Sequence, residues 1–179
     1  MYACRWMLLP SFLLFSLAGG PKAVRVQAAM ADKDTLRIGW AATDITPDKP
    51  VMLQGQFHAR VSEGVKDPVT ATVLALQSPQ DETQMVLVSC DLVIVHDALR
   101  DAVRDQLRQK LPELDPMAVL MSATHTHTAP HTSVYSQYQP DRSPIEHPYG
   151  MKLDAMTPAE YVNWASPRIA DAIVHAWQE

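Results

Sequence analysis

The sequence predicts an α/β fold, in which a layered, mixed sheet contains a parallel strand–helix–strand crossover and a C-terminal helix packs on the sheet. Short apolar runs at residues 36–45, 69–76 and 85–90 are typical of strands. A segment with a four-residue apolar period, 97–111, lies between the third run and another at 118–126. Because a strand, helix, strand order favours a right-handed parallel connection, this part predicts the crossover.

Proline, glycine and polar residues separate the first three predicted strands. The run 36–45 stops at Thr46-Pro47-Asp48, since proline cannot continue a central ladder. Residues 54–60 have mixed polarity around Gly55, which suits a loop that approaches a ligand or another backbone closely. The run 85–90 is almost continuously apolar and predicts a central strand covered on both faces, with Cys90 as a small buried hydrophobe.

The segment 97–111 is predicted to form an amphipathic helix with Asp97 at its N-cap. Its apolar stripe consists of Leu99, Val103, Leu107 and Leu111. Its other faces carry acid–base pairs at i,i+3, which indicate a solvated surface and no function. These pairs are Asp97/Arg100, Asp101/Arg104 and Asp105/Arg108.

The C-terminal third combines an irregular segment with a helix. Residues 129–156 are rich in Pro, Ser, Gln and Tyr and exceed the usual connection length, which favours a segment that lines a site or moves. Thr157-Pro158-Ala159-Glu160 has the pattern of a capping box with proline at the first helical position. Pro167 is expected to kink or split the helix that follows.

Residues 1–28 are expected to be a signal peptide, because Arg5 precedes an apolar run too short to span a membrane and Ala28 ends a small-residue pattern. The protein is then secreted or periplasmic, with one domain at 36–179. Cleavage would remove three basic residues and no acids, changing the formal charge from −5 to −8. This excess of acidic residues argues against a nucleic-acid partner.

His125 and His127 are the most informative residues. If the last predicted strand continues to Thr126, their side chains point to the same side, because strand residues alternate between faces. Neutral imidazole is a good zinc ligand, and ligands bind at the carboxyl ends of strands in open α/β sheets. The alternative is a pair of solvated or hydrogen-bonded histidines at a sheet edge. His131 follows Pro130 and could reach the same place.

Asp91 ends the preceding strand and would lie on the same rim, where it could orient an imidazole by accepting its second N–H. Capping or turn formation is the alternative role of this carboxylate. His96 and His58 are weaker candidates, and His175 is expected to be structural or solvated.

The usual hydrolase and nucleotide signatures are missing. The chain has no Gly-x-Ser-x-Gly elbow, His-Glu-x-x-His helix or glycine-rich phosphate loop. A catalytic zinc normally takes three protein ligands and keeps one open position, whereas this rim offers only two or three candidates. The site is therefore expected to be incomplete.

Several motifs follow the order found in a known family. They are Ala41-Ala42-Thr43-Asp44-Ile45-Thr46-Pro47, Gly55-Gln56, the strand after Asp67, Val88-Ser89-Cys90-Asp91-Leu92 and Ser122-Ala123-Thr124-His125-Thr126-His127-Thr128-Ala129-Pro130. In these motifs the chain resembles the N-terminal part of the neutral/alkaline, non-lysosomal ceramidases, and His-Thr-His before a small residue and proline is the most specific element.

Members of that family are exported zinc amidases that cleave the amide between a fatty acid and a sphingoid base. The resemblance implies that this chain acts on ceramide-like lipids and that His125 binds Zn²⁺. It also implies that His127 faces the substrate or the zinc-bound water. From its place at the end of the preceding strand, we expect Asp91 to act beside it in the catalytic site. We also expect Gly55, Gln56 and His131 to bind the substrate.

The chain departs from the family in two ways. Ala129 and His131 stand where the family usually has glycines, so backbone approach or substrate choice is expected to differ. Family members are also much longer, and their other zinc ligands and catalytic serine lie in parts with no counterpart here. We therefore expect an N-terminal fragment or truncated relative whose partner is the missing C-terminal region of a longer homologue. Peripheral contact with a membrane is left open.

Two other functions compete with this hypothesis. The shortage of metal ligands favours a secreted, non-catalytic module of the same fold that binds lipid, sugar or another subunit. Alternatively, His-x-His could belong to the first strand of an amidohydrolase barrel, which the single crossover and the preceding strands fit poorly.

Overall fold

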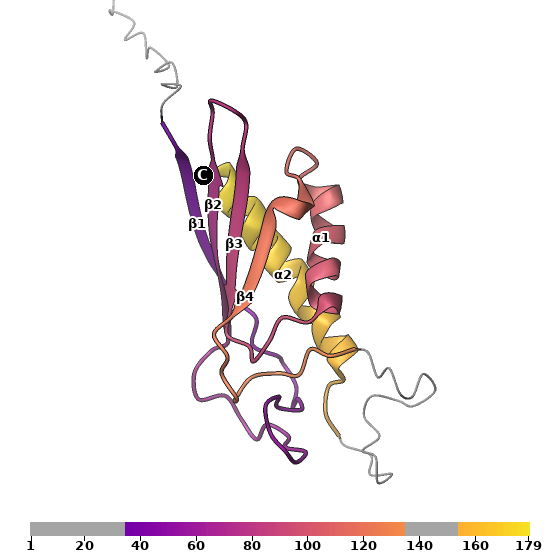
Figure 1. Cartoon of the computed structure of the whole chain (residues 1–179). Helices are drawn as coiled ribbons and strands as arrows, with labels where there is room; N and C mark the ends of the chain where they lie inside the picture. Colours follow the sequence, from indigo (N-terminus) through magenta and orange to yellow (C-terminus); the bar gives the residue numbers. More distant parts are fainter. Residues whose placement is uncertain (1–34, 135–153) are drawn as a thin grey trace, which may run out of the picture. The chain divides into compact units, whose positions relative to one another are not determined.

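The computed structural model describes residues 35–134 and 154–179, which form a mixed α/β layer structure (Figure 1). The sheet has the order β1-β2-β3-β4. Its first three strands pair antiparallel, whereas β3 and β4 are parallel and α1 connects them. The elements are β1 (Arg37–Asp44), β2 (Thr70–Gln77), β3 (Gln84–Cys90), α1 (Asp97–Lys110), a 3₁₀ turn (Pro116–Ala118), β4 (Val119–Ala123) and α2 (Pro158–Gln178). The predicted fold class and crossover are confirmed.

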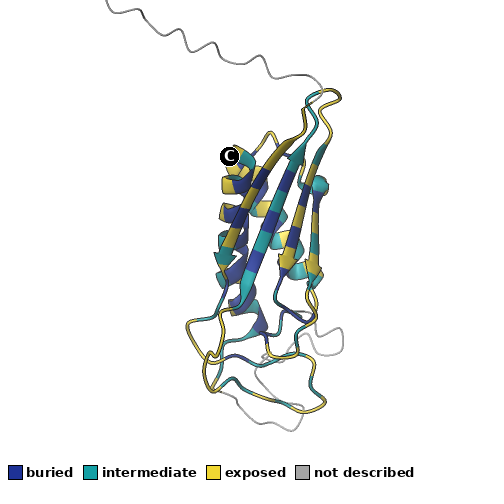
Figure 2. Cartoon of the chain, turned by 90° about the vertical axis from the view of Figure 1, so that its left-hand side faces the viewer, coloured by how far each residue is buried: buried dark blue, intermediate teal, exposed yellow. Residues whose placement is uncertain are grey.

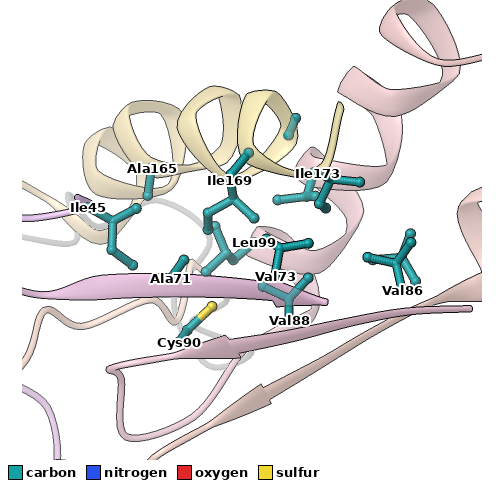
Figure 3. Close-up of a cluster of buried hydrophobic side chains, with 14 of the residues drawn as sticks. Ile45, Ala71, Val73, Val86, Val88, Cys90, Leu99, Ala165, Ile169 and Ile173 are labelled. Atoms are coloured by element: carbon teal, nitrogen blue, oxygen red, sulfur yellow. The ribbon is translucent and has the colours of Figure 1, made fainter. Parts of the chain in front are cut away.

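The core lies between the sheet and the two helices (Figure 3). Val73 and Val88 point from β2 and β3 toward Leu99 of α1 and Ile169 of α2, and all four are 0–1% exposed. Strand β1 approaches α2 so closely that a Cβ on Gly39 would lie 1.7 Å from the backbone oxygen of Ala176. Burial of these alternating strand residues fixes the register of the sheet, since a one-residue slip would expose them.

The opposite face of the sheet is exposed, as the alternating bands in Figure 2 show. On β3, Met85 is 41% and Leu87 38% exposed, whereas Val86 between them is buried. The strand is internal as predicted, but the expectation that it is covered on both faces is wrong for the described residues. Both helices of the described chain pack on one side, so only every second residue of β3 enters the core.

Apolar residues on this outer face form a row that crosses the whole sheet. The register pairs Trp40 with Leu74, Leu74 with Leu87, and Leu87 with Leu120. Trp40 is 58% and Leu120 52% exposed. The continuous apolar run of β3 therefore reflects an exposed apolar surface as well as the core.

The N-cap of α1 lies one residue before the predicted one. The N-cap is His96, whose side chain makes no capping hydrogen bond, and Asp97 is the first helical residue. Asp97 accepts a hydrogen bond from Arg100 at 2.9 Å, as the i,i+3 spacing predicts. Arg104, however, donates to the Val119 carbonyl at 3.0 Å, because it lies near the turn that enters β4.

Helix α2 has the predicted capping box. The Thr157 hydroxyl accepts from the Glu160 backbone N–H at 3.1 Å, and the Glu160 carboxylate accepts from the Thr157 N–H at 2.7 Å. The helix continues through Pro167 as one element, so proline does not split it. Its buried Tyr161 donates to the carbonyl of Ile45 at 2.9 Å, which ties the end of β1 to the helix.

Cys90 is fully buried, as predicted for a small hydrophobe. Desolvation, with a smaller effect of the neighbouring Asp91 carboxylate, raises the pKa of Cys90 to about 12. The side chain is therefore a neutral thiol near pH 7 and a poor nucleophile.

The predicted signal peptide, residues 1–28, lies outside the described residues. The compact unit that contains the sheet and helices is Ala31–Glu179. In the part of this unit that the structure describes, none of the helices combines the length and apolarity needed to cross a membrane.

Candidate metal and catalytic site

The candidate site is built from loops at the edge where β1, β3 and β4 end, at the bottom of the sheet in Figure 1. The parallel ladder ends at the pair Cys90–Ala123. Beyond it, the Thr124 N–H donates to the Cys90 carbonyl and the His125 N–H to the Leu92 carbonyl, both at 2.9 Å. These two bonds hold residues 124–131, the histidine loop, against the turn that follows β3.

His125 has a left-handed backbone, with φ of 65°. Its ring Nδ1 lies 2.7 Å from the carbonyl oxygen of Val93. A carbonyl only accepts hydrogen bonds, so Nδ1 must carry the proton, and the neutral ring keeps its lone pair on Nε2. Metal-binding histidines are commonly oriented in this way, by donation from the other ring nitrogen to a backbone carbonyl.

The rings of His125 and His127 lie together, with centroids 5.0 Å apart and planes at 74°. Their predicted proximity is confirmed, but the argument from strand alternation was wrong. Strand β4 ends at Ala123, not near Thr126, and the left-handed residue at 125 breaks the strand geometry. A loop conformation, held by the turn after β3, brings the two imidazoles together. Both histidines are exposed, so the pair is open to solvent.

His127 lies against the loop that contains Gly55. The Gln56 side-chain amide donates to the His127 carbonyl at 3.0 Å. Gly55 has φ of 87°, and a Cβ there would lie 2.6 Å from Cγ of the His127 ring. The glycine does make a close approach, but to the side chain of a histidine of the candidate site and not to the ligand or backbone that was predicted.

The same two loops pair through their backbones. Leu53 and Pro130 form an antiparallel bridge. The Gln54 N–H donates to the Ala129 carbonyl at 3.0 Å, and the His131 N–H donates to the Met52 carbonyl at 2.9 Å. Segment 52–56 therefore lies alongside residues 127–131 of the histidine loop.

His131 belongs to a second histidine pair. Its ring stacks with that of His96, with centroids 6.2 Å apart. Gln54, which no sequence motif singled out, places its amide nitrogen 2.8 Å from His96 Nε2. The Ser133 N–H donates to His131 Nδ1 at 3.2 Å. Burial, together with His96, lowers the pKa of His131, so this ring favours its neutral form.

Asp91 is hydrogen-bonded to the first residue of β2. Its carboxylate accepts hydrogen bonds from the Thr70 backbone N–H at 3.1 Å and the Thr70 hydroxyl at 2.6 Å. Of the two roles considered for Asp91, orienting the His125 imidazole is wrong, because the group that accepts from His125 Nδ1 is the Val93 carbonyl. In its described contacts, Asp91 therefore connects two strand ends at the rim.

Two other histidines of the described chain are exposed to solvent. His58 is exposed in the loop after Gln56. His175, on α2, is 65% exposed and pairs with Glu179 at 3.3 Å, as expected for a solvated residue. Within residues 35–134 and 154–179, no group of three or more His, Cys, Asp or Glu side chains is arranged to hold a metal. His125 could hold a metal through one ring nitrogen, but the described residues do not provide a complete set of ligands beside it.

An open cavity of about 710 Å³ adjoins the histidine loop. Thr128 and Pro130 line one side, and Leu53, Arg60 and Val61 lie among the residues that line the rest. The volume is within the range of small-molecule sites, about 300–1,000 Å³.

No family model matches the chain, and no curated protein matches its sequence. Two similar solved structures are neutral ceramidase from Pseudomonas aeruginosa and a ceramidase described as complexed with C2. The first has a TM-score of 0.66 and 22% identity over 83% of this chain, and the second 0.61 and 21% over 80%. The chain spans 22% and 21%, about a fifth, of those two chains. It therefore has the fold of part of a neutral ceramidase. The four-stranded sheet, antiparallel over β1–β3, also excludes the barrel alternative for the described residues.

Proposed function

We propose that this chain forms part of a zinc-dependent amidohydrolase that resembles neutral ceramidase and hydrolyses the N-acyl amide of ceramide-like lipids. The observation that carries the proposal is the His125 ring, whose Nδ1 donates to Val93 and whose Nε2 faces away from that bond with a free lone pair. The fold similarity supports the same family. We further propose that the protein is exported and that donors outside the described residues complete the site.

In this mechanism His125 would hold the metal through Nε2. A bound zinc ion would supply a water acidified to a pKa of about 7 and would polarise the amide carbonyl. His127, 5.0 Å from His125 between ring centroids, would donate a hydrogen bond to the oxygen on which negative charge develops. The Val93 carbonyl would keep His125 in the required tautomer during each turnover.

The metal role is tested by comparing zinc affinity in the wild-type chain, His125→Ala and His175→Ala. The control replaces an exposed histidine on α2, remote from the candidate pair. We expect His125→Ala to lower the affinity by at least tenfold and His175→Ala to leave it within about twofold. Equal affinities in all three proteins would refute the assignment of His125.

Amidase activity is tested with a fluorescent N-acyl amine, with and without a chelator. Turnover that the chelator abolishes and zinc restores would support the proposal. A longer form carrying the remainder of the enzyme provides the second arm, because this chain spans about a fifth of the solved ceramidases. Undiminished turnover in His125→Ala would refute the mechanism.

A second candidate is a secreted, non-catalytic module of the same fold. The lack of a group of three or more metal-binding side chains in the described residues favours it. This module would bind the acyl amine without cleaving it and independently of zinc. Zinc-dependent turnover would exclude it.

A further inference from the structure

We propose that Gly55 and Gln56 are positioning residues, which set the orientation of the His127 imidazole. Only the consequence for catalysis rests on the proposed function; the orientation of the ring does not. From the sequence we expected both residues to bind the substrate. Their described contacts, however, are with His127, so we infer that they act on the substrate through this ring.

The first step of the argument is the contact between Gly55 and the ring. A Cβ on Gly55 would lie 2.6 Å from Cγ, 2.7 Å from Nδ1 and 3.1 Å from Cδ2 of His127. Side-chain carbons do not approach a ring so closely, so a Cβ at position 55 would require the ring to move, and glycine leaves the space that the observed ring position needs. The His125 ring is a second neighbour, with planes at 74°. The position of His127 is therefore limited by Gly55 and by His125.

The second step is the attachment of the His127 backbone. The Gln56 amide donates to the His127 carbonyl at 3.0 Å, and the Gln54 N–H donates to Ala129 two residues further along. The Leu53–Pro130 bridge extends this pairing. Segment 53–56 thus fixes the backbone from which the ring projects, as well as the space that the ring can occupy.

The third step is that His125 has a separate support. Its backbone N–H and its Nδ1 donate to the Leu92 and Val93 carbonyls, which belong to the turn after β3. The two histidines are therefore held by different segments of the chain. A change in the loop that contains Gly55 should move His127 while leaving the orientation of His125 intact.

The experiment compares Gly55→Ala with Gly64→Ala. A Cβ on Gly64 would meet no heavy atom within 4 Å, and the φ of Gly64 is not in the left-handed range, so this variant controls for the general effect of adding a methyl to a loop glycine. Histidine ring ¹H–¹⁵N spectra, assigned with His125→Ala and His127→Ala, report each imidazole without zinc or turnover. We expect Gly55→Ala to shift the His127 ring signals, with His125 little changed, and Gly64→Ala to shift neither.

Backbone strain at φ of 87° could also cause the shift of the His127 signals in Gly55→Ala. The variant Gly55→Asn distinguishes this strain from the contact with the ring. Asparagine tolerates the left-handed region but still carries a Cβ. We expect Asn and Ala at position 55 to shift the His127 ring alike. A wild-type spectrum in folded Gly55→Asn, or an unchanged His127 ring in folded Gly55→Ala, would overturn the proposal.

Gln56→Met provides a test that introduces no clash, because it removes the amide donor and keeps the side-chain length. It should also shift the His127 signals, and unchanged signals would contradict the role of Gln56. In a form with amidase activity, Gly55→Ala should lower kcat by about tenfold or more, with KM and zinc affinity nearly unchanged. A longer, folded form that binds no zinc would refute the proposed function yet could still show these ring shifts, so the two failures are distinguishable.

Discussion

The one-sided packing of the sheet predicts very different costs for two leucine truncations. Leu107 of α1 is fully buried, whereas Leu87 of β3 points to the outer face and is 38% exposed. Leu107→Ala should destabilise the protein by about 3 kcal/mol, because it loses the transfer free energy of the removed carbons and leaves a cavity. Leu87→Ala leaves no enclosed cavity and loses only part of the transfer term, so about 1 kcal/mol or less is expected.

Urea unfolding followed by circular dichroism measures both values. With a slope of about 1–3 kcal/mol/M, the variants should differ in midpoint by roughly 1 M. Leu120→Ala, at a 52% exposed position on the same face, should behave like Leu87→Ala and serves as the matched comparison. An equal loss of stability at positions 87 and 107 would refute the one-sided core and show that the outer face is covered in solution.

Three other predictions concern side chains that are buried or partly buried. Tyr161→Phe should cost about 1–2 kcal/mol in the free energy of unfolding, because it leaves the Ile45 carbonyl without its donor; an unchanged urea midpoint would contradict this. The other cysteine of the chain, Cys4, lies in the predicted signal peptide. In Cys4→Ser, Cys90 should react with a thiol reagent only after unfolding. Because its pKa is raised from 9.0 to about 12, its contribution to stability should be lost as pH rises through that interval. Rapid labelling of the native protein at pH 8 would refute its burial. The pKa of His131 is lowered from 6.5, so stability should fall as pH drops below 6.5 and less so in His131→Gln. Parallel pH profiles of the two proteins would contradict that prediction.

Local sequence patterns predicted the elements well, because each strand and helix has its own periodicity. The stripe through Leu99, Val103 and Leu107 is buried in α1, and the box at Thr157 and Glu160 caps α2. The same patterns could not show how many layers cover β3. A continuous apolar run is compatible both with two covered faces and with one covered and one exposed apolar face, and only the placement of both helices on one side distinguishes them.

The cap of α1 illustrates a smaller limit. Asp97 was the natural choice, since aspartate is a preferred capping residue. The helix instead begins after His96, and Asp97 accepts from Arg100 within the first turn. An acidic residue in the first turn is also favourable to the helix dipole, so the sequence signal fits both positions and fixes the start only to within a residue.

At the site, the sequence identified the important pair for a partly incorrect reason. Alternation along a strand would place His125 and His127 on one face, but the ladder ends before either of them. Their proximity depends on the left-handed backbone at His125 and on two carbonyls of the turn after β3. Nothing in the spacing of His-x-His reveals these contacts, because they join segments about 30 residues apart in the chain.

His127 depends on a still longer connection, from a loop 71 residues earlier that provides Gln56 as a donor and Gly55 as an open space. A glycine in a polar loop indicates a close approach but not its partner. This arrangement has a physical consequence for the proposed chemistry. His125 is oriented by donation to a backbone carbonyl, which no side-chain substitution removes, whereas His127 is confined by a glycine and one side-chain amide. Changes in the loop around Gly55 should therefore alter the group proposed to face the substrate while leaving the proposed metal ligand in place.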